Sequence, residues 1–231
     1  MNLSNVTLVI IDCVDIDRCV TPIRKSTENI TFGDIVLLTS IRTYIDVDVR
    51  IIYIDKLIDL YEYSKFIIRR LADYVNTDFV LVIQWDGYVV DSSKWTDEFL
   101  KYDYIGAPWS NGLVGNGGFS LRSKKLLDFC KINGNYMINS VLKLKNELGT
   151  NVYCEDAILT DIHKNYLSKN SFRISPIELA KQFSSEYTTY NGEFGWHGVG
   201  GNTPGKVIKS NPYIKYKIDN NINHYMKFPG G

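Results

Sequence analysis

Five consecutive apolar residues at positions 79–83 are followed by Gln, Trp, Asp and Gly, in the segment FVLVIQWDG. An apolar run without alternation is typical of a strand that is covered on both faces, as in the middle of a parallel sheet. Asp86 then falls where the strand ends, and ligands of open α/β sheets bind at that edge. A carboxylate there can hold a metal ion that in turn binds a diphosphate. The alternative is an Asp that forms a turn with Gly87.

The first 80 residues contain three further strand-like runs and two helix-like segments. The runs lie at 6–12, 34–40 and 49–55, and the helical segments at 21–30 and 57–75. This order predicts an α/β fold with a mostly parallel central sheet and helices on both of its faces. Neither a GxGxxG motif nor a Walker A lysine loop follows the first run, so the two common phosphate-binding signatures are absent.

The second part of the chain predicts further helices and then a loop-rich tail. Helices are expected at 93–101, with Ser92 or Ser93 as the cap, and at 124–130, 137–148 and 156–167. From about residue 176, glycine clusters indicate loops. Since no internal repeat or clear linker interrupts the sequence, we expect one domain over residues 1–231.

Composition excludes several classes of function. The 26 Lys and Arg residues balance 26 Asp and Glu residues, which gives no electrostatic reason for a nucleic-acid partner. No apolar run is long enough to span a membrane, and the first residues lack the basic start of a signal peptide. The four cysteines show no CxxC spacing. We therefore expect reduced thiols in a cytoplasmic protein.

Two motifs contain metal-ligand residue types. Gln84 and Asp86 would point the same way if the strand continued through them, which would place two oxygen donors side by side. His197 lies between an aromatic residue and a glycine in the segment FGWHG, and a neutral imidazole can ligate a metal. The alternative for His197 is a histidine on a surface loop. His163 and His224 have no comparable context and are expected to be structural.

Two other motifs could contact a substrate. Asn116, Gly117 and Gly118 present backbone without side chains at two positions, which permits close approach of a ligand or a bulge in an edge strand. Glu155 and Asp156 begin a predicted helix, where the helix dipole favours acids. One of them could instead act as a general base, since a carboxylate of nearly normal pKa can take a proton that leaves as the new bond forms. Adjacent acids also repel each other, which can raise the pKa of one of them and separate their roles.

Aromatic residues make up 13% of the chain, and most of them are expected in the core. A flat ring can also pack on the C–H face of a sugar. Tyr104, Trp109 and Trp196 lie beside the motifs described above, so they are the candidate sugar platforms.

Together, the segments QWDGYV, YDYIGAPW and GNGGFSLRS, the acid pair and FGWHG resemble a family of bacterial and viral glycosyltransferase-like domains, long known only as a domain of unknown function. The resemblance covers roughly residues 6–200. It implies a GT-A fold and an inverting transferase that uses a nucleoside diphosphate sugar, with a UDP-sugar favoured. It also implies a glycan or lipid-linked acceptor, a Mn²⁺ or Mg²⁺ cofactor, and a location in the cytoplasm of a bacterium or of a virus-infected host cell.

The resemblance also assigns roles to residues. Asp86 matches the second acid of an Asp-x-Asp metal motif, whereas Gln84 stands where the first acid would be, which weakens the expected metal site. His197 matches a late metal-binding histidine. Asp156 matches the catalytic base, with Glu155 as the alternative.

Substrate contacts are implied in both halves of the chain. Residues of about 1–90 would form the nucleotide-binding half, and those of about 91–231 the acceptor-binding and catalytic half. The donor would contact Trp109, Asn116, Gly117 and Gly118, and the nucleotide would contact Asp12, Thr39, Tyr63, Ser64 and Lys65.

Two other functions remain open from the sequence. A nucleotidyltransferase would need a basic loop after the first strand, but residues 13–20 carry one Arg, and with Asp12 included the segment has three acids. A catalytically degenerate domain that only binds carbohydrate or nucleotide is favoured by Gln84, since an acid is missing from the metal motif.

Overall fold

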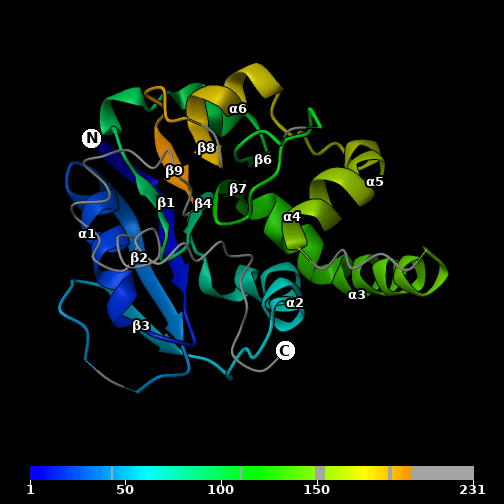
Figure 1. The fold of residues 1–231 in the computed structure, drawn as a ribbon, viewed down its shortest axis with the longest axis horizontal. Coiled ribbons are helices and arrows are strands. Elements are labelled where there is room, and N and C mark those ends of the chain that lie inside the picture. Colours follow the sequence, from blue (N-terminus) through cyan, green and yellow to red (C-terminus); the bar gives the residue numbers. More distant parts are fainter. Residues whose placement is uncertain (43, 110, 149–153, 187–188, 199–231) are drawn as a thin grey trace.

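A six-stranded sheet forms the centre of the computed structural model, with strand order β3-β2-β1-β4-β7-β6 (Figure 1). The structure describes residues 1–42, 44–109, 111–148, 154–186 and 189–198. The strands are β1 (Asn2–Ile11), β2 (Thr31–Thr39), β3 (Arg50–Tyr53), β4 (Phe79–Ile83), β6 (Tyr104–Ile105) and β7 (Phe119–Ser123). The first four are parallel, and β7 and β6 join in antiparallel pairs. The predicted mostly parallel sheet is confirmed.

The register aligns the carboxyl ends of the central strands. Ile10 of β1 pairs with Leu37 of β2 on one side and with Ile83 of β4 on the other. The residues that follow these strands therefore gather at one edge of the sheet, as the pattern of apolar runs predicts.

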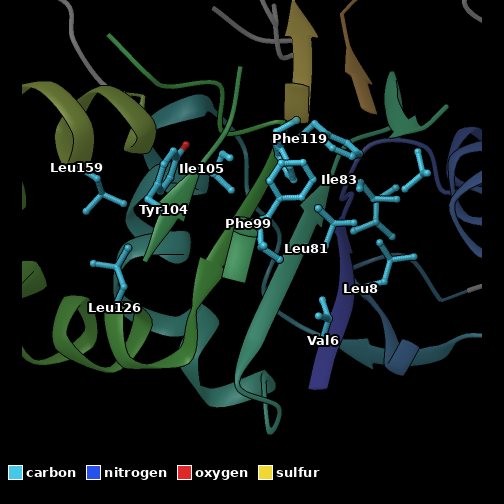
Figure 2. Packing of buried hydrophobic residues seen from close by; sticks show 14 of the residues in the cluster. Val6, Leu8, Leu81, Ile83, Phe99, Tyr104, Ile105, Phe119, Leu126 and Leu159 are labelled. Atoms are coloured by element: carbon cyan, nitrogen blue, oxygen red, sulfur yellow. The ribbon is translucent and has the colours of Figure 1, made fainter. Parts of the chain in front are cut away.

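Helices cover both faces of the sheet, as expected. Alternate residues of β1 point to opposite faces, so Leu8 packs in one apolar cluster with Ile23 of α1 (Val20–Thr27), and Val9 packs in another with Ile67 of α2 (Leu60–Arg70). Figure 2 shows the first cluster, in which the β1 and β4 side chains continue into Phe119. Two 3₁₀-helices, Asp17–Cys19 and Leu71–Tyr74, adjoin α1 and α2.

The two helices predicted at 124–130 and 137–148 are one helix, α3 (Lys124–Leu148). Gly134 lies between the two predicted segments. In the structure a Cβ atom at this position would lie 2.7 Å from Cγ of Arg69 on α2. The glycine therefore stays in the helix because it lets α3 approach α2 closely.

Two other helix predictions need correction. Residues 93–101 form two short 3₁₀-helices, Ser92–Lys94 and Asp97–Lys101, which are capped by Asp91 and Thr96 and not by Ser92 or Ser93. The helix predicted at 156–167 is divided into α4 (Glu155–Ala157), a π-helical turn (Ile158–Ile162) and α5 (Lys164–Lys169).

The segment after residue 176 is not loop-rich where the structure describes it. It forms α6 (Ile177–Phe183) and two strands, β8 (Ser184–Glu186) and β9 (Gly195–His197), which build a second sheet with β5 (Gly87–Val89) in the order β5-β9-β8. The FGWHG motif is thus largely a buried strand and not a surface loop. Residues 199–231, including His224, lie outside the described residues.

None of the helices in the described ranges is long and apolar enough to cross a membrane. His163 is buried, and its Nε2 lies 2.9 Å from Oγ of Ser140, in agreement with a structural role. The four cysteines are free thiols.

Candidate functional site

The second sheet places His197 at the carboxyl end of β4. In β9, His197 pairs with Gly87 of β5 on one side and with Glu186 of β8 on the other. Asp86 directly precedes Gly87, and its carbonyl oxygen accepts a hydrogen bond of 3.1 Å from the N–H of Gly198. The register of three short strands therefore brings together residues more than 100 positions apart.

The imidazole of His197 contacts three polar side chains. Its Nε2 lies 3.4 Å from Oδ1 of Asp86 and 3.1 Å from Oε1 of Gln84, and its Nδ1 lies 3.0 Å from Oε1 of Glu186. Nε2 of Gln84 in turn donates to the hydroxyl of Tyr63 at 3.2 Å. The structure thus brings together Gln84, Asp86 and His197, and it adds Glu186, which the sequence reasoning missed.

Two carboxylates control the charge of His197. Burial alone would lower the pKa of the imidazole, but the charges and hydrogen bonds of Asp86 and Glu186 raise it to about 10. At neutral pH the side chain is therefore an imidazolium that donates to carboxylates on both sides.

The donor atoms at this point suit a divalent cation that also takes ligands from substrate or water. Asp86 and Gln84 provide oxygens and His197 a nitrogen, as Mn²⁺ accepts. Glu186 on Nδ1 corresponds to the carboxylate that commonly orients a metal-binding histidine. The described residues contain no group of three or more His, Cys, Asp or Glu that could hold a metal ion, so a cation at this point would need further ligands from substrate or water.

The glycines of the motifs make room for these side chains. A Cβ atom on Gly118 would lie 2.1 Å from Nε2 of His197, and one on Gly117 would lie 2.0 Å from Oε1 of Glu155. Gly118 therefore touches the imidazole, and Gly117 touches the acid pair. The strand that follows, β7, lies between β4 and β6, so the alternative of an edge-strand bulge is wrong.

Asp156 is held by backbone N–H groups. Its Oδ2 accepts a hydrogen bond of 2.9 Å from Gly117, and its Oδ1 accepts one of 2.8 Å from Ala157. Burial, together with the neighbouring Glu155 carboxylate, raises the pKa of Asp156 to about 7. A carboxylate with this pKa can accept a proton near neutral pH.

Glu155 has a different partner, Arg122 of β7. Nη2 of Arg122 lies 2.7 Å from Oε1 of Glu155, and the two side chains are 0% and 4% exposed. Nε of Arg122 also donates to Oγ of Ser120, and its guanidinium lies 5.2 Å from the ring centroid of Tyr104. Sequence reasoning missed Arg122, although a lone cation inside the strand FSLRS was a usable signal, because buried charges are normally paired.

The two residues at strand ends that were predicted to contact the nucleotide, Asp12 and Thr39, already bond to other groups of the protein. The carboxylate of Asp12 forms an ion pair with Arg18, and its Oδ1 accepts hydrogen bonds from the N–H groups of Val14 and Asp15. Oγ1 of Thr39 is buried and accepts a hydrogen bond from Ile41. Both side chains shape the turns after their strands.

The three candidates on α2 do not face one site. Tyr63 and Ser64 are buried, and Tyr63 reaches Gln84. Lys65 instead lines a cavity of about 580 Å³, together with Arg42 and Arg69. Tyr63 is therefore linked to His197 through a hydrogen bond to Gln84.

Two of the proposed aromatic platforms are wrong. Tyr104 and Trp196 are both 0% exposed, so neither ring can receive a sugar. Trp109 is half-buried, and its ring covers Gly115, where a Cβ atom would lie 2.0 Å from Cζ2. The neighbouring Asn116 has a left-handed φ of 62°, and its Nδ2 is buried with no hydrogen-bond partner in the described structure.

Comparison with curated proteins finds no match. Among solved structures, the apo form of glycosyltransferase GlyE from Streptococcus pneumoniae TIGR4 matches with a TM-score of 0.43 and 18% identity, over 75% of this chain and 45% of that chain. A second GlyE structure matches with a TM-score of 0.44 and 18% identity, over 76% and 46%. This chain spans less than half the length of those proteins, and so distant a likeness carries no argument about activity.

A family model does match the chain over the region that contains most of the site. It covers residues 47–197, which include Gln84, Asp86, the glycine pair, the acid pair and His197 but neither Asp12 nor Thr39. Since the matched region is more than half of the chain, this protein belongs to the family described as "Protein of unknown function (DUF5672)".

Proposed function

We propose that this protein is a glycosyltransferase that moves a sugar from a nucleoside diphosphate sugar, with a UDP-sugar favoured, to a hydroxyl group of a glycan or lipid-linked acceptor. One observation carries the proposal. Two neighbouring glycines contact the candidate base and the candidate metal ligands. The N–H of Gly117 donates to Asp156, and Gly118 lies against His197, which is beside Asp86. A group suited to proton transfer and a group suited to diphosphate binding therefore meet at the carboxyl edge of the sheet.

The donor would bind on the side of Asp86. Asp86, Gln84 and His197 are the residues that would hold Mn²⁺ or Mg²⁺, and Glu186 would orient the imidazole through Nδ1. When bound, such a cation supplies positive charge that stabilises the departing diphosphate. His197 must first release its proton, since only a neutral imidazole ligates a metal.

Asp156 would take the proton of the acceptor hydroxyl. The acceptor oxygen forms a bond to the anomeric carbon while the bond from that carbon to the diphosphate oxygen breaks, and the proton moves to the Asp156 carboxylate. A single displacement of this kind inverts the anomeric configuration. Glu155 is paired with Arg122, so we assign it to the positioning of Asp156 and not to proton transfer.

Calorimetry with a panel of nucleoside diphosphates, with and without Mn²⁺, tests the proposal. We expect Mn²⁺-dependent binding of one nucleotide, and loss of that binding in Asp86→Asn. Slow hydrolysis of the matching nucleotide sugar should accompany binding, because water can replace the acceptor. Absence of nucleotide binding with or without metal would contradict the proposal.

A non-catalytic binding domain is the second candidate function. It is supported by the imidazolium that fills the space beside Asp86 and by the absence of a three-ligand metal group among the described residues. In the same experiment this candidate predicts nucleotide or saccharide binding without any hydrolysis or transfer.

A further inference from the structure

A second cavity lies beside β6, apart from the residues discussed above. It has a volume of about 460 Å³ and is bounded by segment 112–114, by Thr160 and Lys164, and by segment 174–177. Ile174 forms a bridge with Tyr104 and so continues the sheet at its edge. The volume is within the range of small-molecule binding sites.

Ser175, which lines the cavity, has a hydroxyl group without a hydrogen-bond partner in the described structure. The residue is 5% exposed, and its backbone N–H donates to the carbonyl of Tyr104. An unsatisfied buried hydroxyl costs free energy, and such groups are rare in folded proteins. The oxygen has less than 1 Å² of accessible surface, so a ligand hydroxyl would reach it after a change of the Ser175 rotamer.

The walls of the cavity are continuous with the segments that hold Asp156. Oγ1 of Thr160 donates a hydrogen bond of 2.9 Å to the carbonyl of Asp156, and Val114 leads through Gly115 and Asn116 to Gly117. Thr160 lies in the π-helical turn Ile158–Ile162, and π-helical turns often mark functional positions. The lining of the cavity is therefore connected through Thr160 to the backbone of Asp156, which does not itself line the cavity.

The lining combines apolar surface with one charge. Leu113 and Ile177 can pack against the C–H faces of a sugar, and Lys164 is the one charged residue among those that line the cavity in the described chain. Lys164 is exposed, and it forms no ion pair with a carboxylate among the described residues. We propose that the cavity binds the acceptor, a saccharide whose hydroxyl bonds to Ser175 and whose acidic group, a carboxylate or a phosphate, pairs with Lys164. This inference rests on the proposed function.

Titration of the full chain with disaccharides, followed by ligand-observed NMR, tests the cavity. The probes are a neutral disaccharide, one with a uronic acid and one with a phosphate monoester. We expect one of the acidic probes to bind about tenfold more tightly than the neutral one, as for a hydrogen bond between charged groups. The two acidic probes distinguish a carboxylate from a phosphate.

Two variants and a matched control make the test specific. Lys164→Glu should remove the preference for acidic probes. Ser175→Ala should weaken binding of all probes a few-fold, which is the size of one hydrogen bond. It should not lower the thermal midpoint, because the hydroxyl of Ser175 has no partner in the described protein. Lys169→Glu, at the other end of α5 and outside the lining, should change nothing.

The outcomes separate this inference from the proposed function. If the wild type binds a nucleoside diphosphate but Lys164→Glu and Ser175→Ala bind the disaccharides as the wild type does, the cavity assignment is overturned and the function stands. If the wild type binds no nucleotide but binds acidic disaccharides through Lys164, the function fails and the cavity stands. Absence of binding for all three probes overturns the cavity assignment.

Discussion

Arg122 and Glu155 form an ion pair that is enclosed by protein, with Nη2 and Oε1 2.7 Å apart and side-chain exposures of 0% and 4%. The pair connects β7 of the central sheet to α4, where Asp156 is the next residue. Burial and the charge of Glu155 raise the pKa of Asp156, while the carboxylate of Glu155 itself is bonded to Arg122. Under the proposed function, this ion pair leaves Asp156 as the acid that takes the proton of the acceptor.

Loss of one partner should strongly destabilise the fold. Glu155→Gln leaves the Arg122 charge buried without its counter-ion, and the expected cost is about 3–5 kcal/mol. Urea unfolding at pH 7 measures it. Lys181→Ala, which removes an exposed ion pair with Glu178, is the control and should cost less than about 1 kcal/mol. If the two substitutions lowered the free energy of unfolding equally, the buried ion pair would contribute no more to stability than the exposed one.

Asp156→Asn should remove transfer without weakening the fold at alkaline pH. The substituted amide cannot accept a proton, so turnover should fall about 10²–10⁴-fold. The folded-state pKa of about 7 lies above the ordinary aspartate value of 3.8. The stability contributed by this group is therefore fully present below about pH 4 and is lost as the pH rises through 7.

Thermal unfolding at pH 5 and pH 8 checks the second half of this prediction. The wild type should lose stability between the two pH values, and Asp156→Asn should lose less. Asp161→Asn, at an exposed position of the same segment, is the control. An Asp156→Asn protein with wild-type turnover would exclude Asp156 as the base.

The contribution of His197 to stability should decline at high pH. Its pKa of about 10 lies above the ordinary histidine value of 6.5. The stability from its ion pairs is thus fully present below about pH 6.5 and is lost as the pH rises through 10. His197→Gln should therefore destabilise the protein most near pH 6, and the difference from the wild type should shrink by pH 10. A difference that is constant with pH would mean that the imidazole is neutral in the fold.

Binding of Mn²⁺ should release a proton from the protein. At pH 7.5 the imidazole of His197 is protonated, and a metal ligand must be deprotonated. Calorimetry in two buffers of different ionisation enthalpy, with the matching nucleoside diphosphate present, should give release of about one proton per Mn²⁺. His197→Gln should abolish the release, and Asp91→Asn, outside the site, should not. Metal binding without proton release would show that His197 is not a ligand.

The sequence alone determined the parts of this fold that depend on local pattern. The unbroken apolar run at 79–83 became β4, the central strand between β1 and β7, because a run without polar residues is stable only where both faces are covered. For the same reason Asp86, the first acid after that run, lies at the carboxyl edge. The helical spacing after residue 57 likewise corresponds to α2.

Tertiary structure decided which distant residues meet at that edge. His197 reaches Asp86 through strand pairings of β9, and the same pairings bury Trp196 and add Glu186. Arg122 finds Glu155 because β7 inserts antiparallel beside β4. A local pattern shows whether a residue tends to be buried, but its partner depends on strand register between segments that lie far apart in the chain. That register is fixed only when the whole core packs.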